Sequence, residues 1–410
     1  MAEVSMIQIL DKKNYFDQAL VSLPNASPLP PLGDSSLRLK TEIMCLTVNN
    51  FTYAKLGHLL HWWDIHPLPS DTPAPYNDPS IYGRINCWGY AKVLESTFAG
   101  VPEGSYLWGY LPIGTLPQDL QVEAGDVSDQ VLVTSGYRQH VMPIYNRYFV
   151  SPASLGSEIE HKADGVAYDA LFRIMHETAY LMAQYVFCPN SSDTIQGTAA
   201  ESSDLSDAIV LVFAPGSKAA LCFASMLRDG REGAKPARVV GVTSEYSKAF
   251  VDATGLYDQT ALTSANPTDV LSSLGADTQQ KVVVFDFGGR AGVAFKWAMT
   301  LKPTYTALRV ALIGSAITDP AESAGSPPPA FPEGLDVLQL NADVMRTAAM
   351  QKTGEVKYFE DIGNSWQEFR STGVRGFKVN WGEGMDDVIQ GWDRLARGEV
   401  TPDEGLAFKL

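Results

Sequence analysis

Long apolar runs alternate with helix-like stretches between residues 208 and 316. Four runs have the length and unbroken apolar character of buried strands: 208–213, 238–242, 281–287 and 308–313. The stretch 219–227, rich in small and apolar residues, has the character of a helix. Unbroken apolar runs separated by helices are typical of a parallel sheet covered on both faces. The pattern therefore predicts an α/β domain whose ligands bind at the carboxyl ends of the strands.

The chain on either side of this region has a different pattern. Short apolar runs between residues 41 and 150 are closely punctuated by Gly and Pro, which is typical of a mostly β domain. Residues 166–187 carry apolar positions at helical spacing, and 321–334 form a loop rich in Pro and Gly. The simplest architecture is a β-rich domain of residues 1–180 and 325–410, interrupted by a nucleotide-binding domain of residues 181–324.

Composition narrows the class of protein. The chain has 410 residues, of which 45% are hydrophobic and 19% charged, as expected of a soluble protein with two domains. It contains no apolar run of about 18 residues and no signal-like N-terminus, which favours a cytoplasmic protein without a membrane partner. The four cysteines are widely spaced, which favours reduced thiols. A net charge of −16 argues against nucleic acid as the main partner.

Short segments spread over most of the chain resemble the medium-chain dehydrogenase/reductase superfamily. They are 47–54, 88–93, 108–112, 145–148, 243–244, 250–257, 285–289 and 381–382. Within it, the chain is most similar to the zinc-independent quinone and enoyl reductases, and closest to a reductase-like family of bacteria and fungi. The resemblance implies a Rossmann-type nucleotide-binding domain inserted in a mostly β, GroES-like catalytic domain. It also implies that a homodimer could form through the nucleotide-binding domains.

The turn after the first strand of the α/β region is the candidate phosphate site. Dinucleotide sites commonly use G-x-G-x-x-G, so that backbone N–H groups at a helix N-terminus meet the pyrophosphate. Here the turn contains a single glycine, in the order Pro215, Gly216, Ser217, Lys218. Ser217 and Lys218 could bind phosphate. Alternatively, Ser217 caps the helix and Lys218 lies in solvent.

The end of the second strand carries hydroxyls and a lysine where NAD sites usually have an acidic residue. Thr243, Ser244 and Lys248 suit the 2′-phosphate of NADP, although Glu245 would oppose that phosphate. The alternative is that Ser244 is an ordinary N-cap. The pattern predicts NADP, oxidised or as NADPH, as the cofactor.

Further strand ends supply the rest of the predicted cofactor site. Tyr257 either lines the adenosine pocket or packs in the core. Phe287 and Gly288 end the third of the long runs, and Gly314 and Ser315 end the fourth. Glycine at these ends would let the backbone approach the cofactor ribose.

The nicotinamide side of the site comes from the other domain. The resemblance places Thr178 beside the nicotinamide, and Asn50, Thr52 and Tyr53 in the loop that faces the reacting carbon. Tyr53 could donate a proton or bind a substrate carbonyl during hydride transfer. The alternatives are that Thr178 bonds its own helical turn and that Tyr53 is a buried aromatic with a satisfied hydroxyl.

Aromatic residues of the β-rich domain could form an apolar substrate pocket. Trp62 and Trp88 are candidates for its walls, and Arg138 and His140 are candidates to orient the substrate. The alternative for the aromatics is the core of the β domain. A pocket of this kind predicts a small, largely apolar substrate, such as a quinone-like or polyketide-like secondary metabolite.

Other chemistries have little support in the sequence. The cysteines are scattered, and the superfamily's zinc-ligand position near Asn50 carries amides, so we expect no zinc. Hydrolase and nucleotide-triphosphatase motifs are missing. The leading hypothesis is an NADPH-dependent reductase of an activated C=C or a quinone. The alternatives are a redox-silent isomerase, lyase or cyclase on the same fold, and a non-catalytic partner of a larger synthase.

Overall fold

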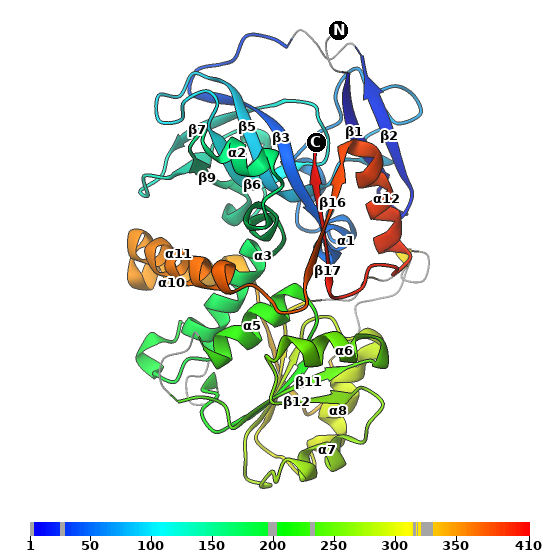
Figure 1. Cartoon of the computed structure of the whole chain (residues 1–410), viewed down its shortest axis with the longest axis vertical. Coiled ribbons are helices and arrows are strands. Elements are labelled where there is room, and N and C mark those ends of the chain that lie inside the picture. Colours follow the sequence, from blue (N-terminus) through cyan, green and yellow to red (C-terminus); the bar gives the residue numbers. More distant parts are fainter. Residues whose placement is uncertain are drawn as a thin grey trace.

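A computed structural model describes residues 4–24, 29–195, 203–229, 234–314, 317, 319–320 and 331–410. Figure 1 shows two parts, an upper one built mainly of antiparallel strands and a lower one with a parallel sheet between helices. No helix among these residues is long and apolar enough to span a membrane.

The lower part contains a six-stranded parallel sheet in the order β12-β11-β10-β13-β14-β15. The strands are β10 (Ile209–Phe213), β11 (Arg238–Thr243), β12 (Gln259–Leu262), β13 (Val282–Asp286), β14 (Leu308–Leu312) and β15 (Asp336–Gln339). The order reverses beside β10, because the chain moves outward to β12 and then returns to β13, as in a doubly wound sheet. The α/β prediction is confirmed. The sheet nevertheless continues to β15, beyond residue 324, where the sequence pattern ended this domain.

Helices cover both faces of the parallel sheet (Figure 1). They are α5 (Lys218–Arg228), α6 (Glu245–Thr254), α7 (Pro267–Ser273) and α8 (Val293–Leu301). One face packs with α7 and α8 in a separate apolar cluster that includes Leu271 and Trp297. The other face shares a continuous apolar cluster with α5 and with the upper part of the molecule.

The upper part contains an antiparallel barrel. Strand β3 (Ser36–Leu46) pairs with both β5 and β7, so the sheet closes on itself. The other barrel strands are β5 (Asn86–Ser96), β6 (Tyr106–Pro112), β7 (Gln118–Ala124), β8 (Gln130–Val133) and β9 (Arg147–Ser151). A small sheet of β1 (Ser5–Asp11), β2 (Gln18–Leu23) and β4 (Tyr82–Gly83) lies beside it. The predicted mostly β domain is therefore confirmed.

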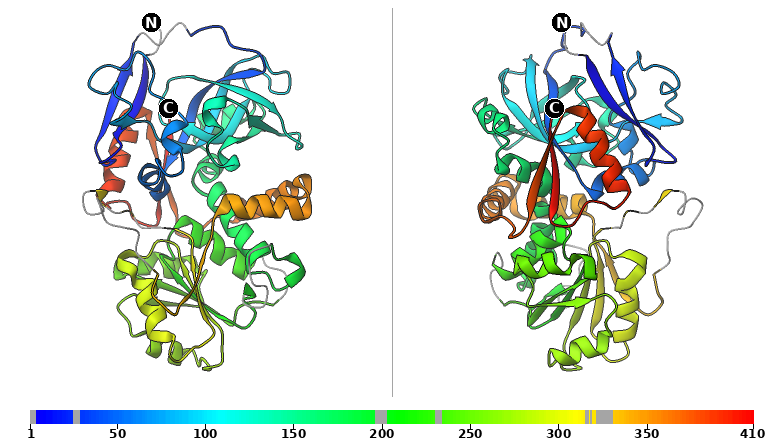
Figure 2. Two further views of the ribbon diagram at one scale, coloured as in Figure 1. Left: turned by 180° about the vertical axis from the view of Figure 1, so that it is seen from behind. Right: turned by 45° about the vertical axis from the view of Figure 1, so that its right-hand side comes forward.

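The C-terminal segment returns to the barrel, as the sequence pattern predicted. Strand β17 (Glu404–Lys409) pairs with β3 and with β16 (Lys378–Glu383). Helix α12 (Gly384–Ala396) lies against β1 and β2, as Figure 2 shows. The indole N–H of Trp392 donates to the carbonyl of Tyr15 at 3.1 Å, which ties the two ends of the chain together.

Helix α3 (Asp164–Leu181) connects the two parts, and it continues into a π-helical turn at Met182–Val186. It packs against α5 of the lower part and against α10 (Ala342–Thr353) and α11 (Glu355–Thr372). The remaining helices are α1 (Val48–Lys55) and α2 (Leu155–Glu160). Short 3-10 turns lie at Trp62–Asp64, Gly136–Arg138, Pro143–Asn146, Ser191–Asp193 and Arg290–Gly292.

Candidate cofactor and substrate site

The predicted phosphate turn joins β10 to α5 at the carboxyl edge of the parallel sheet. Ala214 begins it with φ +54°, a left-handed conformation that glycine adopts more readily than alanine. Ser217 is the N-cap, and its hydroxyl accepts the N–H of Ala220 at 3.4 Å. The turn therefore has a glycine-like backbone although alanine stands at its first position.

The C-terminal segment of the chain covers this turn. A Cβ atom on Gly216 would lie 2.9 Å from the Cβ atom of Pro402. The ammonium of Lys218 donates to the carbonyl of Glu404 at 3.4 Å and lies 5.3 Å from the ring centre of Phe377. Burial lowers the pKa of Lys218 to about 8. Lys218 is thus neither directed into solvent nor held open for a phosphate, because the chain itself supplies its acceptor.

Tyr257 supports the same turn from inside. Its buried hydroxyl donates to the carbonyl of Pro215 at 2.7 Å. Its ring packs over Gly241 of β11, where an added Cβ would lie 3.1 Å from the ring. These contacts correspond to the packing alternative for Tyr257.

The end of β11 presents hydroxyls beside a lysine. Thr243 is buried, whereas Ser244 is exposed and its Oγ lies 3.4 Å from the Oγ of Ser247. Ser244 is the N-cap of α6, but its side chain makes no capping hydrogen bond. Lys248 pairs with Asp252 at 2.6 Å on the same helix and remains partly exposed. An anion could bind at this edge only if Lys248 released Asp252 and paired with the anion instead.

The ends of β13 and β14 lie close together. The backbone N–H groups of Gly288 and Gly289 donate to Oδ1 of Asp286 at 2.9 and 2.6 Å. A Cβ on Gly314 would lie 2.7 Å from the carbonyl oxygen of Phe287, so only glycine fits there. Burial raises the pKa of Asp286. Ser315 lies outside the described residues, and Phe287 is buried in the core.

Tyr53 of α1 has a hydroxyl with an unused hydrogen. Its oxygen accepts the indole N–H of Trp88 at 2.9 Å and the amide N–H of Asn49 at 3.4 Å. Within the described part of the chain, no acceptor is recorded for the phenolic hydrogen. Burial raises the pKa of Tyr53 well above its usual range, so the phenol stays protonated. Tyr53 therefore has a free hydroxyl hydrogen inside a buried aromatic cluster, with only 4% of the residue exposed.

The neighbours of Tyr53 differ in part from those that the sequence suggested. Asn49 contacts Tyr53 and also lies 3.7 Å from the sulfur of Met175 on α3. Asn50 instead caps α1, because its Oδ1 accepts the N–H of Thr47 at 2.7 Å and its Nδ2 donates to the carbonyl of Asn86. Its amide is thus engaged within the fold, and Asn49 was missed although it stands next to Asn50.

Thr52 and Thr178 are partly exposed. The hydroxyl of Thr178 donates to the carbonyl of Ile174 at 3.2 Å, which corresponds to the alternative of a bond within its own helix. Thr178 follows Met175 by three positions on α3, so both lie on the helix face directed at Asn49.

The predicted substrate residues separate in the structure. Trp62 and Trp88 are buried in an aromatic cluster around Tyr53, and the ring centres of Trp62 and Tyr53 are 4.8 Å apart. Arg138 is wholly buried, and its three nitrogens donate to Asn146, Tyr148 and the Tyr145 carbonyl. His140 is exposed, 5.7 Å from the ring of His61. Arg138 therefore stabilises the barrel instead of presenting charge to a ligand.

Arg84, just before β5, was missed by the sequence analysis. It is only 5% exposed, and its Nε and Nη2 have no hydrogen-bond partner. Burial lowers its pKa to about 10. No periodicity or motif marks an arginine of this kind, because its isolation depends on residues that are distant in sequence.

The described residues contain no group of three or more His, Cys, Asp or Glu side chains placed to hold a metal ion. His58 and His61, which are closely spaced in the sequence, are both exposed. The four cysteines are buried and unpaired.

Comparisons with known proteins identify the fold. A family model described as "Protein of unknown function (DUF2855)" matches residues 44–401. No curated protein matches the chain in sequence. The structure of CurA from Vibrio vulnificus in complex with NADPH has a TM-score of 0.58 at 11% identity and covers 98% of both chains.

Two further structures have the same arrangement of domains. A mutant form of enoyl thioester reductase from Candida tropicalis has a TM-score of 0.55 at 11% identity over the whole of both chains. The CurF ER cyclopropanase from the curacin A biosynthetic pathway has a TM-score of 0.54 at 10% identity, and covers 99% of this chain and 98% of that one. These structures confirm the fold that the resemblance to medium-chain reductases implied.

Proposed function

We propose that this chain, which belongs to the DUF2855 family of proteins of unknown function, is an NADPH-dependent reductase of an activated C=C or a quinone. The observation that carries the proposal is the Tyr53 hydroxyl. Its oxygen accepts two N–H groups and its own hydrogen has no recorded acceptor among the described residues, while Asn49 beside it contacts Met175 of the helix that joins the two domains. The substrate class is small and largely apolar, because the walls around Tyr53 are aromatic.

The carboxyl edge of the parallel sheet supports a dinucleotide. The left-handed Ala214 and the N-terminus of α5 provide a turn of the type that meets a pyrophosphate. Ser244 and Lys248 would hold the 2′-phosphate, and the glycine backbone at positions 288 and 314 would lie along the ribose. The CurA structure was determined with NADPH, which supports this choice of cofactor. When bound, NADPH supplies the hydride.

Tyr53 would act on the substrate oxygen. The N–H groups of Trp88 and Asn49 draw electron density from the phenolic oxygen, which makes its O–H a stronger hydrogen-bond donor. Such a donor stabilises the negative charge that develops on a carbonyl oxygen as hydride adds to the β-carbon. The resulting enolate then takes a proton from Tyr53 or from water.

Titration with NADPH and NADH, followed by nicotinamide fluorescence, tests the cofactor. We expect tighter binding of NADPH, and we expect Lys248→Ala to weaken it about tenfold or more while leaving NADH unchanged. Lys357→Ala is the matched control, because Lys357 and Asp361 form an equivalent i,i+4 pair on α11. Failure of both nucleotides to bind at millimolar concentration would exclude the reductase.

Activity on a panel of enones and quinones tests Tyr53. We expect Tyr53→Phe to lower kcat about a hundredfold with little change in NADPH affinity, since it removes only a transition-state donor. An unchanged kcat in a folded variant would remove Tyr53 from the mechanism.

The C-terminal cover of the phosphate turn favours a second candidate, a redox-silent isomerase, lyase or cyclase. Pro402 fills the space beside Gly216, and the carbonyl of Glu404 accepts a hydrogen bond from the Lys218 ammonium. Both contacts lie where a cofactor phosphate would bind. One structure of this fold carries the name cyclopropanase, which supports chemistry other than reduction. Nucleotide binding without NADPH consumption on any enone or quinone would favour this candidate.

A further inference from the structure

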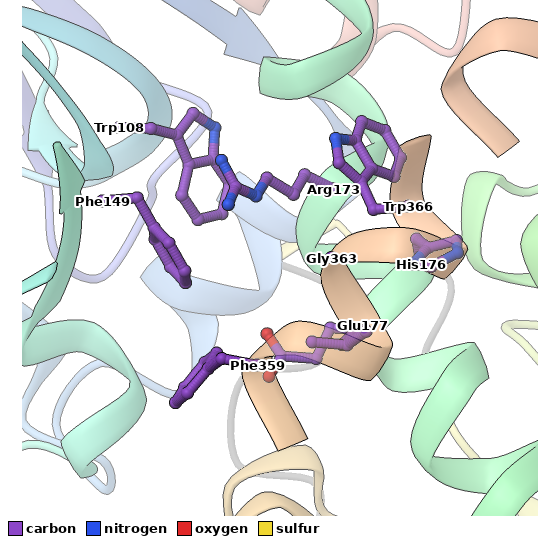
Figure 3. A pocket seen from close by; sticks show the side chains of 9 residues that line it. Trp108, Phe149, Arg173, His176, Glu177, Phe359, Gly363 and Trp366 are labelled. Carbon is purple, nitrogen blue, oxygen red and sulfur yellow. The ribbon is translucent and has the colours of Figure 1, made fainter. Parts of the chain in front are cut away.

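A second site lies on another side of α3, between that helix, strands β6 and β9, and α11. It is a cavity of about 30 Å³ that is partly open to solvent. Figure 3 shows Arg173 reaching across from α3 towards Trp108, with Phe149, Phe359, Trp366 and Glu177 around the space. The site is separate from Tyr53, because Arg173 and Glu177 follow one face of α3 while Met175 and Thr178 follow another.

Two aromatic rings hold the Arg173 guanidinium. Its carbon lies 4.6 Å from the ring centre of Trp108 and 4.1 Å from that of Phe149. The two rings stand edge to face, with centres 5.6 Å apart, so they flank the guanidinium on adjacent sides and leave the rest of its N–H groups for hydrogen bonds. These two contacts favour one orientation of the guanidinium before any ligand arrives.

Arg173 differs from the other arginines around this cavity. Arg147 pairs with Glu355 at 2.7 Å, Arg370 pairs with Asp169 at 3.1 Å, and Arg346 pairs with Glu177. Across the described ranges, no hydrogen bond or ion pair is recorded for the side chain of Arg173. A partly buried guanidinium normally has an anionic partner, because removing its hydration is costly.

The acidic residues one turn away on α3 are already engaged. Asp169 accepts hydrogen bonds from Tyr90 and Trp366, both at 3.0 Å, in addition to its ion pair. Glu177 accepts the hydroxyl of Tyr358 at 2.8 Å as well as the Arg346 guanidinium. The charge of Arg173 acts on Glu177 at a distance, but no hydrogen bond or ion pair joins Arg173 to either carboxylate among the described residues.

We propose that this cavity binds the carboxylate of a small molecule whose flat apolar group lies against the aromatic rings. A planar guanidinium edge matches the two oxygens of a carboxylate. The cavity admits only a few atoms, whereas sites that enclose whole ligands measure several hundred Å³. It would therefore hold the carboxylate end, while the aromatic body contacts Phe359 and Trp366 of the lining.

Calorimetric titration with benzoate, and with benzamide as its neutral counterpart, tests the proposal. We expect saturable binding of benzoate, weakened at least about tenfold by Arg173→Met, which keeps an apolar stem against the rings but removes the charge. Benzamide should bind weakly and equally to both proteins. Arg375→Met, at an exposed arginine beside Gly255, is the matched control and should leave benzoate binding unchanged.

Three results would overturn the proposal. One is equal affinity of wild type and a folded Arg173→Met variant for benzoate. Another is the lack of saturable benzoate binding up to about 10 mM, since a charge-assisted contact should raise affinity above that level. The third is tighter binding of phenyl phosphate than of benzoate, which would assign the site to phosphate esters. Each result is independent of whether NADPH binds.

Discussion

Two of the cations that lie against aromatic rings in this protein, Lys218 and Arg173, have opposite surroundings. Lys218, at the predicted phosphate turn, lies over Phe377 and donates to the carbonyl of Glu404. Arg173, in the cavity beside α11, lies against Trp108 and Phe149 and has no recorded acceptor among the described residues. A motif in the sequence pointed to the first, and nothing in the sequence pointed to the second.

The comparison shows that a charged side chain is available to a ligand only where the fold gives it no partner. Lys218 has the residue type and position of a phosphate ligand, but its ammonium already donates to the Glu404 carbonyl in the C-terminal segment. Arg173 has no motif, but its neighbouring carboxylates are already paired with other groups. The following variants change the pairing in each region.

The largest expected effect comes from Arg346→Met, which leaves Glu177 buried without its counter-ion. Breaking a buried ion pair of this kind typically lowers the free energy of unfolding by about 3–5 kcal/mol. Denaturation in urea measures it. We also expect weaker benzoate binding. Without Arg346, the charge of Glu177 is left to interact with Arg173, which then has an anionic partner within the protein, as Lys218 has its carbonyl acceptor.

The pH dependence checks that explanation. Burial raises the pKa of Glu177, but the Arg346 guanidinium outweighs it and lowers the pKa below the ordinary value. The stabilisation by this pair is therefore present above about pH 4.3 and is lost as pH falls through the lower folded pKa. In the variant Glu177 is buried without its ion pair, so the stability gap should narrow on acidification. A gap that is constant with pH would contradict this assignment.

A second pair of buried cations, Arg138 and Arg84 in the β-rich part, allows the same comparison. Arg138→Met leaves three acceptors without donors, and we expect a loss of about 3 kcal/mol or more. Arg84→Met removes an arginine with two unpartnered nitrogens, and we expect a gain of about 1 kcal/mol. Thermal and urea unfolding of both variants would show the contrast. Equal losses would mean that Arg84 has a partner in solution.

Lys218→Met tests whether burial at the phosphate turn lowers the pKa of Lys218. The folded pKa of Lys218, about 8, lies below its ordinary value of 10.5, so the unfolded chain binds more protons between these limits. Wild type should gain stability relative to the variant as pH rises from about 8 to 10, by about 2 kcal/mol after allowance for partial exposure. A pH-independent difference would show that Lys218 is well hydrated.

The smallest expected effect is that of Ala214→Gly. Alanine in the left-handed region is disfavoured by about 1 kcal/mol, and glycine removes that strain. We expect a gain of up to about 1 kcal/mol, reduced by the greater flexibility of glycine in the unfolded chain. Ala219→Gly, within helix α5, is the control and should destabilise the protein.

Much of the fold could be predicted because it depends on local patterns. The strands β10, β11, β13 and β14 lie within the four apolar runs or extend them by one residue. The return of the C-terminal segment to the barrel was expected as the simplest architecture, with the loop rich in Pro and Gly at 321–334 between the domains. β15 was missed, because its sequence Asp336-Val337-Leu338-Gln339 is too short and polar to resemble the other parallel strands.

The candidate site was less predictable, because its contacts join distant segments. Asn50 and Asn49 are adjacent in the sequence, yet one caps α1 and the other contacts Tyr53 and Met175. Arg138 and His140 are two residues apart, yet one is wholly buried and the other exposed. Helix and strand geometry turn adjacent residues to different faces, and only the packed neighbours determine which face is buried.

The sequence by itself determined the two-domain architecture, the parallel sheet and the glycines at its strand ends, because periodicity and backbone conformation are properties of short segments. The tertiary structure decided which charged groups are available. Glu404 lies 186 residues from Lys218, and Glu177 lies 169 residues from Arg346, so no local pattern could show that these partners meet. Whether a charged or hydrogen-bonding group is available depends on contacts across the whole fold, which among the described residues leave the Tyr53 hydrogen, Arg173 and two nitrogens of Arg84 without a recorded hydrogen-bond partner.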